Sequence, residues 1–334
     1  MCRILTALMR RQLLPALALV FALLLPQSLL AWNATGHQVV AGIAWDNMTP
    51  AARRNVIGLL QAAPEDACLR DLFPTDARPL ELRQREFFMR AATWADLVRS
   101  NGDDDKRACT RFHRRDWHFI NYFWEGISGA TGEDAPRNRR DVKTPEVDAV
   151  ERLGWLRQNV TCSTAVCATS AEERATMLAW ILHLAGDIHQ PLHASARVTT
   201  APGEEQGDQG GNLFKLGTEQ RSPSLHSYWD RIVDASVPRR EHETNNYGAY
   251  LARVMAMIEQ EHPRAAAAPR LHAGDFAEWS LESFETTTLL VYPATLQRNV
   301  LPDDAYRERA FAASRTALAM AGYRLADLLN QMFA

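Results

Sequence analysis

The sequence predicts an all-α fold in a single domain. Residues that favour helix starts precede apolar segments at several places, and apolar residues near the end of the chain recur at helical spacing. No segment alternates apolar and polar residues with comparable regularity, which argues against a large sheet. No internal repeat or linker-like segment divides the 334 residues. We therefore expect one domain over residues 32–334, long enough to bury a substantial core.

Three helices are expected in the first hundred residues. The pattern Thr35-Gly-His-Gln38 has the form of a capping box, which would open the first helix. Thr49 before Pro50 would open the second, because proline fits the first turn of a helix. A third helix is expected over about residues 84–99. The next two polar segments are expected as loops: 100–110 and 126–145.

The rest of the chain predicts further helices. Ser170-Ala-Glu-Glu173 is a second capping box, and its helix should run to about Gln190, where Pro191 ends it. Ser222-Pro223 would open another helix. The segment Ala265–Ala268 is expected as a short helix or a loop. A last helix over about residues 306–332 is predicted by the spacing of its apolar residues, Phe311, Leu318, Leu325 and Leu329.

The first 31 residues have the features of a secretory signal peptide. Three arginines precede an apolar run over residues 13–25, and Ala31 marks the expected cleavage site. The run is too short to predict a membrane span. The pair Arg10-Arg11 leaves twin-arginine export as an alternative route to general secretion. We expect a secreted or periplasmic mature protein without a membrane anchor.

The cysteines agree with export. Cys2 lies in the leader, and an even number remains in the mature chain, which favours disulfides in an oxidising compartment. Three pairings exist in principle, and a cysteine–zinc site is the alternative. The expected pairs are Cys68 with Cys109 and Cys162 with Cys167.

The charge balance disfavours one class of function. The formal net charge is −3, and loss of the leader with its three arginines would make it −6. An acidic protein is a poor candidate for non-specific duplex binding driven by counterion release. If the substrate were a nucleic acid, bound cations would have to offset the charge of the phosphates.

Histidines and aspartates at matching spacing predict a metal centre. His183 and Asp187 lie four residues apart on one expected helix and therefore share a face. His226 and Asp230 repeat this spacing, and His193 follows shortly after the first pair. A lone histidine is usually a packed or surface residue, but nitrogen and carboxylate donors in this number are typical of zinc. The remaining candidates are His37, Asp96, His118 and the amino group of Trp32, which cleavage would free.

Six motifs, in this order along the chain, resemble those of the zinc-dependent single-strand nucleases of the S1/P1 family. They are Trp32-Asn-Ala-Thr-Gly-His37, Trp94-Ala-Asp96-Leu-Val-Arg99, Trp117-His118-Phe-Ile-Asn121, His183-Leu-Ala-Gly-Asp187-Ile-His-Gln-Pro-Leu-His193, Gly210-Gly-Asn212 and Leu225-His226-Ser-Tyr-Trp-Asp230. Together they span about two-thirds of the mature chain.

The resemblance implies three Zn²⁺ ions in an all-α domain of the phospholipase C/nuclease type. Asp187 would bridge the first two ions. The ligands of the first would be Asp96, His118, His183 and Asp187. Those of the second would be Asp187, His37 and the amino and carbonyl groups of Trp32. Those of the third would be His193, His226 and Asp230.

The resemblance also implies the reaction. Hydroxide bridging the first two ions would attack phosphorus in line in single-stranded DNA or RNA, leaving a 5′-phosphate. The same site would act on 3′-nucleotides. Arg99 would hold the phosphate, and Phe119 would stack a base whose edge Asn121 binds, beside the loop of Gly210 and Asn212. Asn121 replaces the aspartate of the fungal enzymes. No stable protein partner is implied, and a monomer is expected.

Two other functions share parts of this pattern. The related zinc-dependent phospholipases C carry a similar three-zinc site, but their last carboxylate is typically Glu, where this chain has Asp230. A non-catalytic zinc-binding protein would not need Arg99, Phe119 or Asn212. Without the resemblance, Phe119 could equally be a core residue and Arg99 a surface ion-pair partner.

Overall fold

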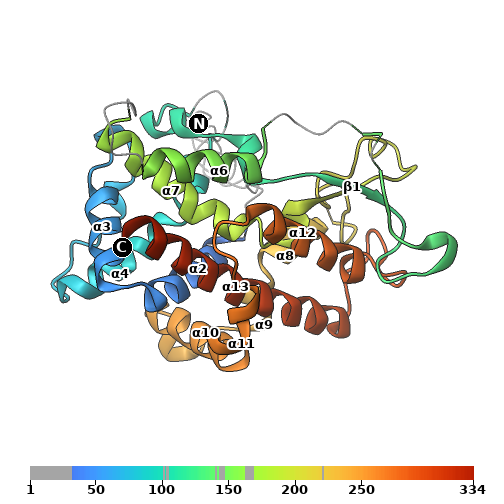
Figure 1. Ribbon diagram of the computed structural model, residues 1–334. Helices are drawn as coiled ribbons and strands as arrows, with labels where there is room; N and C mark the ends of the chain where they lie inside the picture. Colours follow the sequence, from blue (N-terminus) through green and yellow to red (C-terminus); the bar gives the residue numbers. More distant parts are fainter. Residues whose placement is uncertain are drawn as a thin grey trace, which may run out of the picture.

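The computed structural model describes residues 32–100, 102, 105–139, 141–142, 147–161, 169–219 and 222–334. Over these residues the chain is mostly helical, which confirms the predicted fold class (Figure 1). The α-helices are α2 (Ala34–Asn47), α3 (Pro50–Gln61), α4 (Leu80–Ala91), α5 (Trp94–Leu97), α6 (Ala149–Val160), α7 (Ala171–Asp187), α8 (Leu225–Asp230), α9 (Ile232–Ser236), α10 (Tyr247–Glu261), α11 (Arg264–Ala267), α12 (Phe276–Thr286) and α13 (Asp304–Phe333).

Short helical turns connect these helices. The 3₁₀ turns are η1 (Glu65–Ala67), η2 (Arg70–Leu72), η3 (Ala108–Phe112), η4 (Arg115–His118), η5 (Gly132–Asp134), η6 (Pro191–Ala194), η7 (Glu241–Glu243) and η8 (Ala268–Arg270), and η9 (Thr287–Val291) is a π-helical turn. Two of them, η4 and η6, carry predicted site residues.

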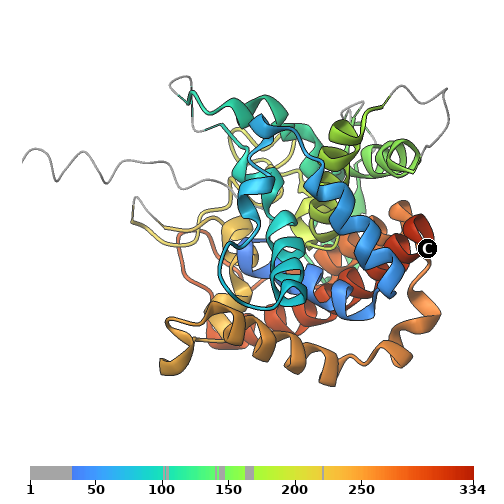
Figure 2. The ribbon, with the colours of Figure 1, turned by 90° about the vertical axis from the view of Figure 1, so that its left-hand side faces the viewer.

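The helices pack around a core in which α2 and α13 lie side by side (Figure 1). Helix α7 packs against α6 and α3, and its C-terminal half is entirely buried. Figure 2 shows α10 along the lower edge of the molecule, as in Figure 1. No helix in the described part of the chain is long and apolar enough to cross a bilayer.

Three short strands form a sheet that the sequence did not predict. β1 (Tyr122–Glu125) lies between β2 (Arg137–Asn138), antiparallel to it, and β3 (Ser195–Arg197), parallel to it. Strands of two to four residues are too short to show alternation in the sequence. The strand β1 directly follows the segment that carries His118 and Phe119, so the sheet anchors one side of the predicted site.

Several predicted helix ends are confirmed. The hydroxyl of Ser170 accepts from the backbone N–H of Glu173, and the Glu173 carboxylate accepts from that of Ser170, which is a complete capping box. Thr49 caps α3, with Pro50 in its first turn. Helix α13 covers the predicted C-terminal segment, and α11 forms in the alanine-rich segment.

Three expectations at helix ends were wrong. Helix α2 is capped by Asn33 instead of Thr35, because the Thr35 hydroxyl is bonded to Asp234. Helix α8 begins after Ser224, two residues later than expected. The helix expected over 84–99 is broken between α4 and α5, where the carbonyl of Ala92 accepts from the ring of His183 instead of continuing the helix.

One of the two predicted disulfides is present. Cys68 and Cys109 are bonded, with their Cα atoms 5.8 Å apart, and join η1 to η3. Cys162 and Cys167 lie outside the described residues, as does the predicted leader.

Candidate metal centre and active-site pocket

The first group of predicted ligands surrounds Asp187 at the buried end of α7. Asp187 Oδ1 lies 3.3 Å from His37 Nε2. Asp187 Oδ2 lies 3.0 Å from His118 Nδ1 and 3.2 Å from His183 Nε2. Two donors on one tetrahedral zinc, with bonds of about 2.0–2.1 Å, are separated by about 3.3 Å. The spacing around Asp187 therefore fits shared metal ligands.

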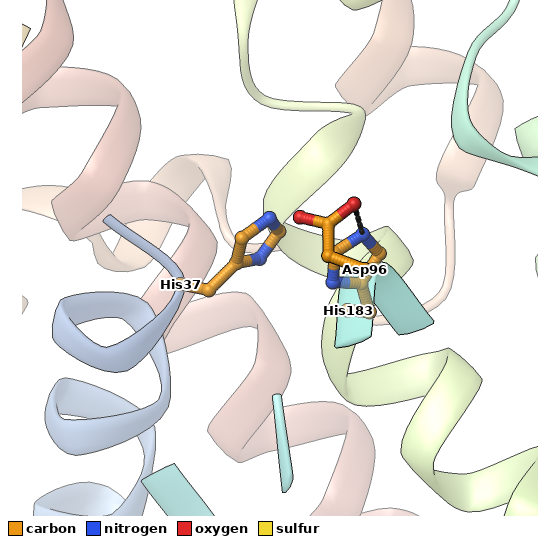
Figure 3. A group of neighbouring side chains, drawn as sticks. All are labelled: His37, Asp96 and His183. Atoms are coloured by element: carbon orange, nitrogen blue, oxygen red, sulfur yellow. Dashed lines mark ion pairs between the residues drawn. The ribbon is translucent and has the colours of Figure 1, made fainter. Parts of the chain in front are cut away.

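Asp96 completes this cluster from α5. Figure 3 shows that Asp96, His37 and His183 point toward one another, and the Asp96 and His183 side chains approach to 3.9 Å. One donor atom from each of these three residues lies within 4.8 Å of the others. His118, His183 and Asp187 form an overlapping group by the same measure, so the side-chain donors predicted for the first two ions occupy one continuous cluster.

The remaining predicted side-chain ligands form a separate group. His193, His226 and Asp230 also offer donor atoms within 4.8 Å of one another. The rings of His193 and His226 have their centres 4.8 Å apart, and His226 Nε2 lies 3.7 Å from Asp230 Oδ2. His193 comes from η6, and the other two come from one face of α8.

Backbone carbonyls fix the orientation of three of these imidazoles. The Nδ1 atoms of His183, His193 and His226 donate to the carbonyls of Ala92, His118 and Gly210, at 2.7–2.8 Å. In the neutral ring that donates from Nδ1, the lone pair of Nε2 is left for the site. Histidines that ligate metals typically hold their second nitrogen in this way.

Several buried polar atoms in the site have no hydrogen-bond partner. Such atoms would be costly in an apolar interior, whereas a bound cation would satisfy them. They include both ring nitrogens of His37, His118 Nε2, His193 Nε2, Asp96 Oδ1, Asp187 Oδ1 and Asp230 Oδ2. The residues present thus fit a zinc-binding role.

The charges of the two groups differ. Burial opposes protonation of His183, but the carboxylates of Asp187 and Asp96 raise its pKa to about 9. Burial likewise opposes ionisation of Asp187, but the His183 and His193 rings hold its pKa well below the usual range. In the second group, burial raises the pKa of Asp230, and burial with the nearby His193 lowers that of His226 to about 3. A divalent cation would replace the His183 proton in the first group and supply the missing positive charge in the second.

The main chain at Trp32 lies next to the second group. The backbone N–H of Asn33 donates to the carbonyl of Asp230 at 3.0 Å, and the Trp32 side chain is fully buried. This contact holds the start of α2 against the end of α8. The role of the Trp32 amino group as a ligand stays a prediction.

A pocket of about 150 Å³ opens beside both groups. It brings together every residue predicted to bind substrate: Arg99, Phe119, Asn121, Gly210 and Asn212. His118, His193 and His226 also line it, so the predicted metal ligands face the same space. Gly210 leaves no room for a side chain, because a Cβ built there would lie 2.3 Å from the carbonyl oxygen of Leu192.

Three further residues line the pocket that the sequence did not single out. They are Arg115, Leu192 and Gln209. Gln209 adopts a left-handed backbone conformation (φ 55°) just before Gly210 and Gly211, which also have positive φ. Arg115 lies three residues before His118, in a segment with many arginines. Its short sequence separation from His118 is the only signal that could have distinguished it.

Comparison with known proteins agrees with this geometry. The family model described as S1/P1 Nuclease matches residues 32–334. The chain belongs to the S1/P1 nuclease family. Endonuclease 2 of Arabidopsis thaliana is 22% identical over 323 residues, covering 90% of this chain and 90% of that protein. Nuclease P1 of Penicillium citrinum is 22% identical over 317 residues, covering 90% of this chain and 97% of that protein.

The family assignment confirms the resemblance drawn from the six motifs. S1/P1 nucleases are zinc-dependent hydrolases of phosphodiesters, and the three His/Asp groups of this chain could each hold a metal ion. A nuclease family match across the whole described domain also favours nucleic acid over phospholipid as the substrate.

Proposed function

We propose that this chain is a zinc-dependent endonuclease, exported after removal of residues 1–31, that hydrolyses single-stranded DNA and RNA to products with 5′-phosphates. The same site would release phosphate from 3′-nucleotides. The observation that carries the proposal is the pocket itself, in which predicted metal ligands, the Arg99 guanidinium and the Phe119 ring line one space.

The donors support binding of three zinc ions. Asp96, His118, His183 and Asp187 would hold the first, and Asp187, His37 and the main chain of Trp32 the second. His193, His226 and Asp230 would hold the third. When bound, zinc lowers the pKa of water and stabilises negative charge on phosphate oxygens. Removal of the leader frees the amino group of Trp32, which could not serve as a terminal amine in the uncleaved chain.

The remaining pocket residues act on the strand. Arg99 neutralises charge that grows on the phosphate oxygens as water displaces the 3′-oxygen in line. The P–O3′ bond breaks and a new P–O bond forms from water, so no side chain is modified. The half-buried Phe119 ring offers a stacking face, and Asn121 and Asn212 offer amide groups to a base edge. A base in a duplex has no free face, so stacking favours single strands.

The test is hydrolysis by the mature chain that begins at Trp32. Single-stranded DNA, RNA, a 3′-mononucleotide and phosphatidylcholine are offered with chelator and again after zinc is restored. We expect zinc-dependent release of 5′-nucleotides with the lipid intact. Cleavage of the lipid alone would replace the proposal with a phospholipase C, and zinc binding without hydrolysis would favour a zinc-binding protein.

A chain with extra residues before Trp32 tests the amino-group ligand separately. We expect it to bind less zinc than the mature chain. Full zinc content and full activity with the extension present would contradict a role for the Trp32 amine.

A further inference from the structure

Arg115 places a second guanidinium in the pocket that contains Arg99. It is the first residue of η4, whose last residue is His118, and its side chain is exposed at the pocket wall. The turn is held in place because His193 accepts from the backbone N–H of Ile120 at 2.8 Å and its ring donates to the carbonyl of His118. Arg115 therefore begins a turn whose other end is held against the metal cluster.

Arg115 forms no ion pair with a carboxylate among the residues that the structure describes. In the surrounding segment, Arg107 pairs with Asp105 and Arg111 pairs with Asp66, each at 2.7 Å. Among the residues that the structure describes, no carboxylate lies within 4.0 Å of the guanidinium of Arg115 or of Arg99. Their charges also reach His113, where they add to burial in lowering the pKa of the ring.

A cation at this position has a specific use. The formal charge is −3, and −6 without the three arginines of the leader, so a polyanionic strand gains no general attraction from the protein surface. A 3′-mononucleotide has one phosphate, which the metal ions and Arg99 would hold. A longer strand brings further phosphates past the mouth of the pocket, and an exposed guanidinium there can bind one of them.

We propose that Arg115 binds a phosphate of the strand other than the one that is cleaved, and so makes the enzyme prefer oligonucleotides over substrates with a single phosphate. This inference rests on the proposed nuclease function. It assigns Arg115 to substrate selection and leaves the reacting phosphate to Arg99 and the metal ions.

The test compares kcat/KM of the zinc-loaded wild type and of Arg115→Gln on substrates with increasing numbers of phosphates. A dinucleoside monophosphate contains only the scissile phosphate, whereas a trinucleotide and a hexanucleotide add others. For the variant we expect kcat/KM to fall about fivefold on the hexanucleotide and less than twofold on the dinucleoside monophosphate. The slope of log(kcat/KM) against log salt on the hexanucleotide should shrink by about 0.7, as expected for loss of one phosphate contact on a single strand.

Arg114→Gln is the matched control. Arg114 is adjacent, exposed and equally charged, but it does not line the pocket, and its guanidinium donates to the carbonyls of Arg111 and His113. Arg114→Gln should change kcat/KM on the three substrates, and its dependence on salt, much less than Arg115→Gln does. Arg115→Lys, which keeps the charge, should recover part of the preference for the hexanucleotide.

The outcomes separate the two proposals. If the wild type cleaves no nucleic acid, the nuclease function itself is wrong. Arg115 does not select longer strands if the wild type cleaves nucleic acid but Arg115→Gln behaves like Arg114→Gln. The same conclusion holds if Arg115→Gln loses activity equally on substrates of every length. Zinc content and urea unfolding of each variant show whether an equal loss comes from damage to the fold.

Discussion

The side-chain amide of Gln190 donates a 2.7 Å hydrogen bond to Oδ1 of Asp230, and both side chains are buried. The carbonyl oxygen of the same amide accepts from the backbone N–H of Leu192. Both ends of the glutamine are thus engaged, and Oδ2 of Asp230 is left facing His226 without a hydrogen-bond partner. Gln190 therefore determines which oxygen of Asp230 is available to a metal ion.

Gln190→Leu should weaken zinc binding by the group of His193, His226 and Asp230. The substitution keeps the volume but removes the donor to a buried carboxylate and leaves the Leu192 N–H unpaired, which should cost about 2–3 kcal/mol of unfolding free energy. We also expect one zinc ion fewer per chain at limiting zinc, measured by elemental analysis. Gln331→Leu, on the exposed surface, is the control. Unchanged zinc content would show that Asp230 does not depend on Gln190 for its orientation.

The buried His189 predicts an acid-sensitive fold. Its Nδ1 donates to the carbonyl of Ala185, and its Nε2 accepts from Arg324. Burial and the Arg324 charge lower its pKa well below the ordinary value of 6.5. Below pH 6.5 the unfolded chain therefore binds a proton that the folded chain does not, so stability should fall as the pH falls.

His189→Gln should flatten this dependence. Between pH 6.5 and 5, the unfolding free energy of the variant should decline less steeply than that of the wild type, by up to about 1.4 kcal/mol per pH unit. Urea unfolding at several pH values measures both slopes. His242→Gln, which removes an exposed histidine, is the control variant. Equal slopes for His189→Gln and the wild type would mean that His189 is protonated in the fold.

The disulfide between Cys68 and Cys109 should contribute substantially to stability. The two residues are 41 positions apart, and closing a loop of this length removes about 4 kcal/mol of conformational entropy from the unfolded chain. The double variant C68A/C109A should lose an amount of that order, measured by urea unfolding without reductant. A loss below about 1 kcal/mol would show that the unfolded chain is little constrained by this bond.

Local sequence patterns predicted the parts of the site that lie on single helices. The spacing of four residues was sufficient for His183 with Asp187 and for His226 with Asp230, because a helix places such residues on one face. The break between α4 and α5 was not predicted. At that break the carbonyl of Ala92 accepts a hydrogen bond from His183, 91 residues away in the chain.

Residues whose role depends on tertiary position could not be distinguished in the sequence. Arg115 is one of several arginines between residues 106 and 115, and only the turn into His118 directs it to the pocket wall. Gln190 and Gln209 lie in turns where a polar residue is ordinary. Their contacts with Asp230 and the pocket arise from segments brought together by folding.

Gly186→Ala should damage the metal centre. Replacing glycine by alanine inside a helix normally stabilises it by about 0.5–1 kcal/mol. At Gly186, however, a Cβ would lie 2.8 Å from Nδ1 of His37, whose ring stacks on His183 at 4.0 Å. The ring must move, so we expect lower zinc content and at least a tenfold loss of nuclease activity. Gly58→Ala in α3, where a Cβ meets nothing within 4 Å, is the matched control and should stabilise the fold with activity unchanged. If Gly186→Ala instead gained stability and kept its zinc, the close packing of His37 on α7 would not be what holds that ligand in place.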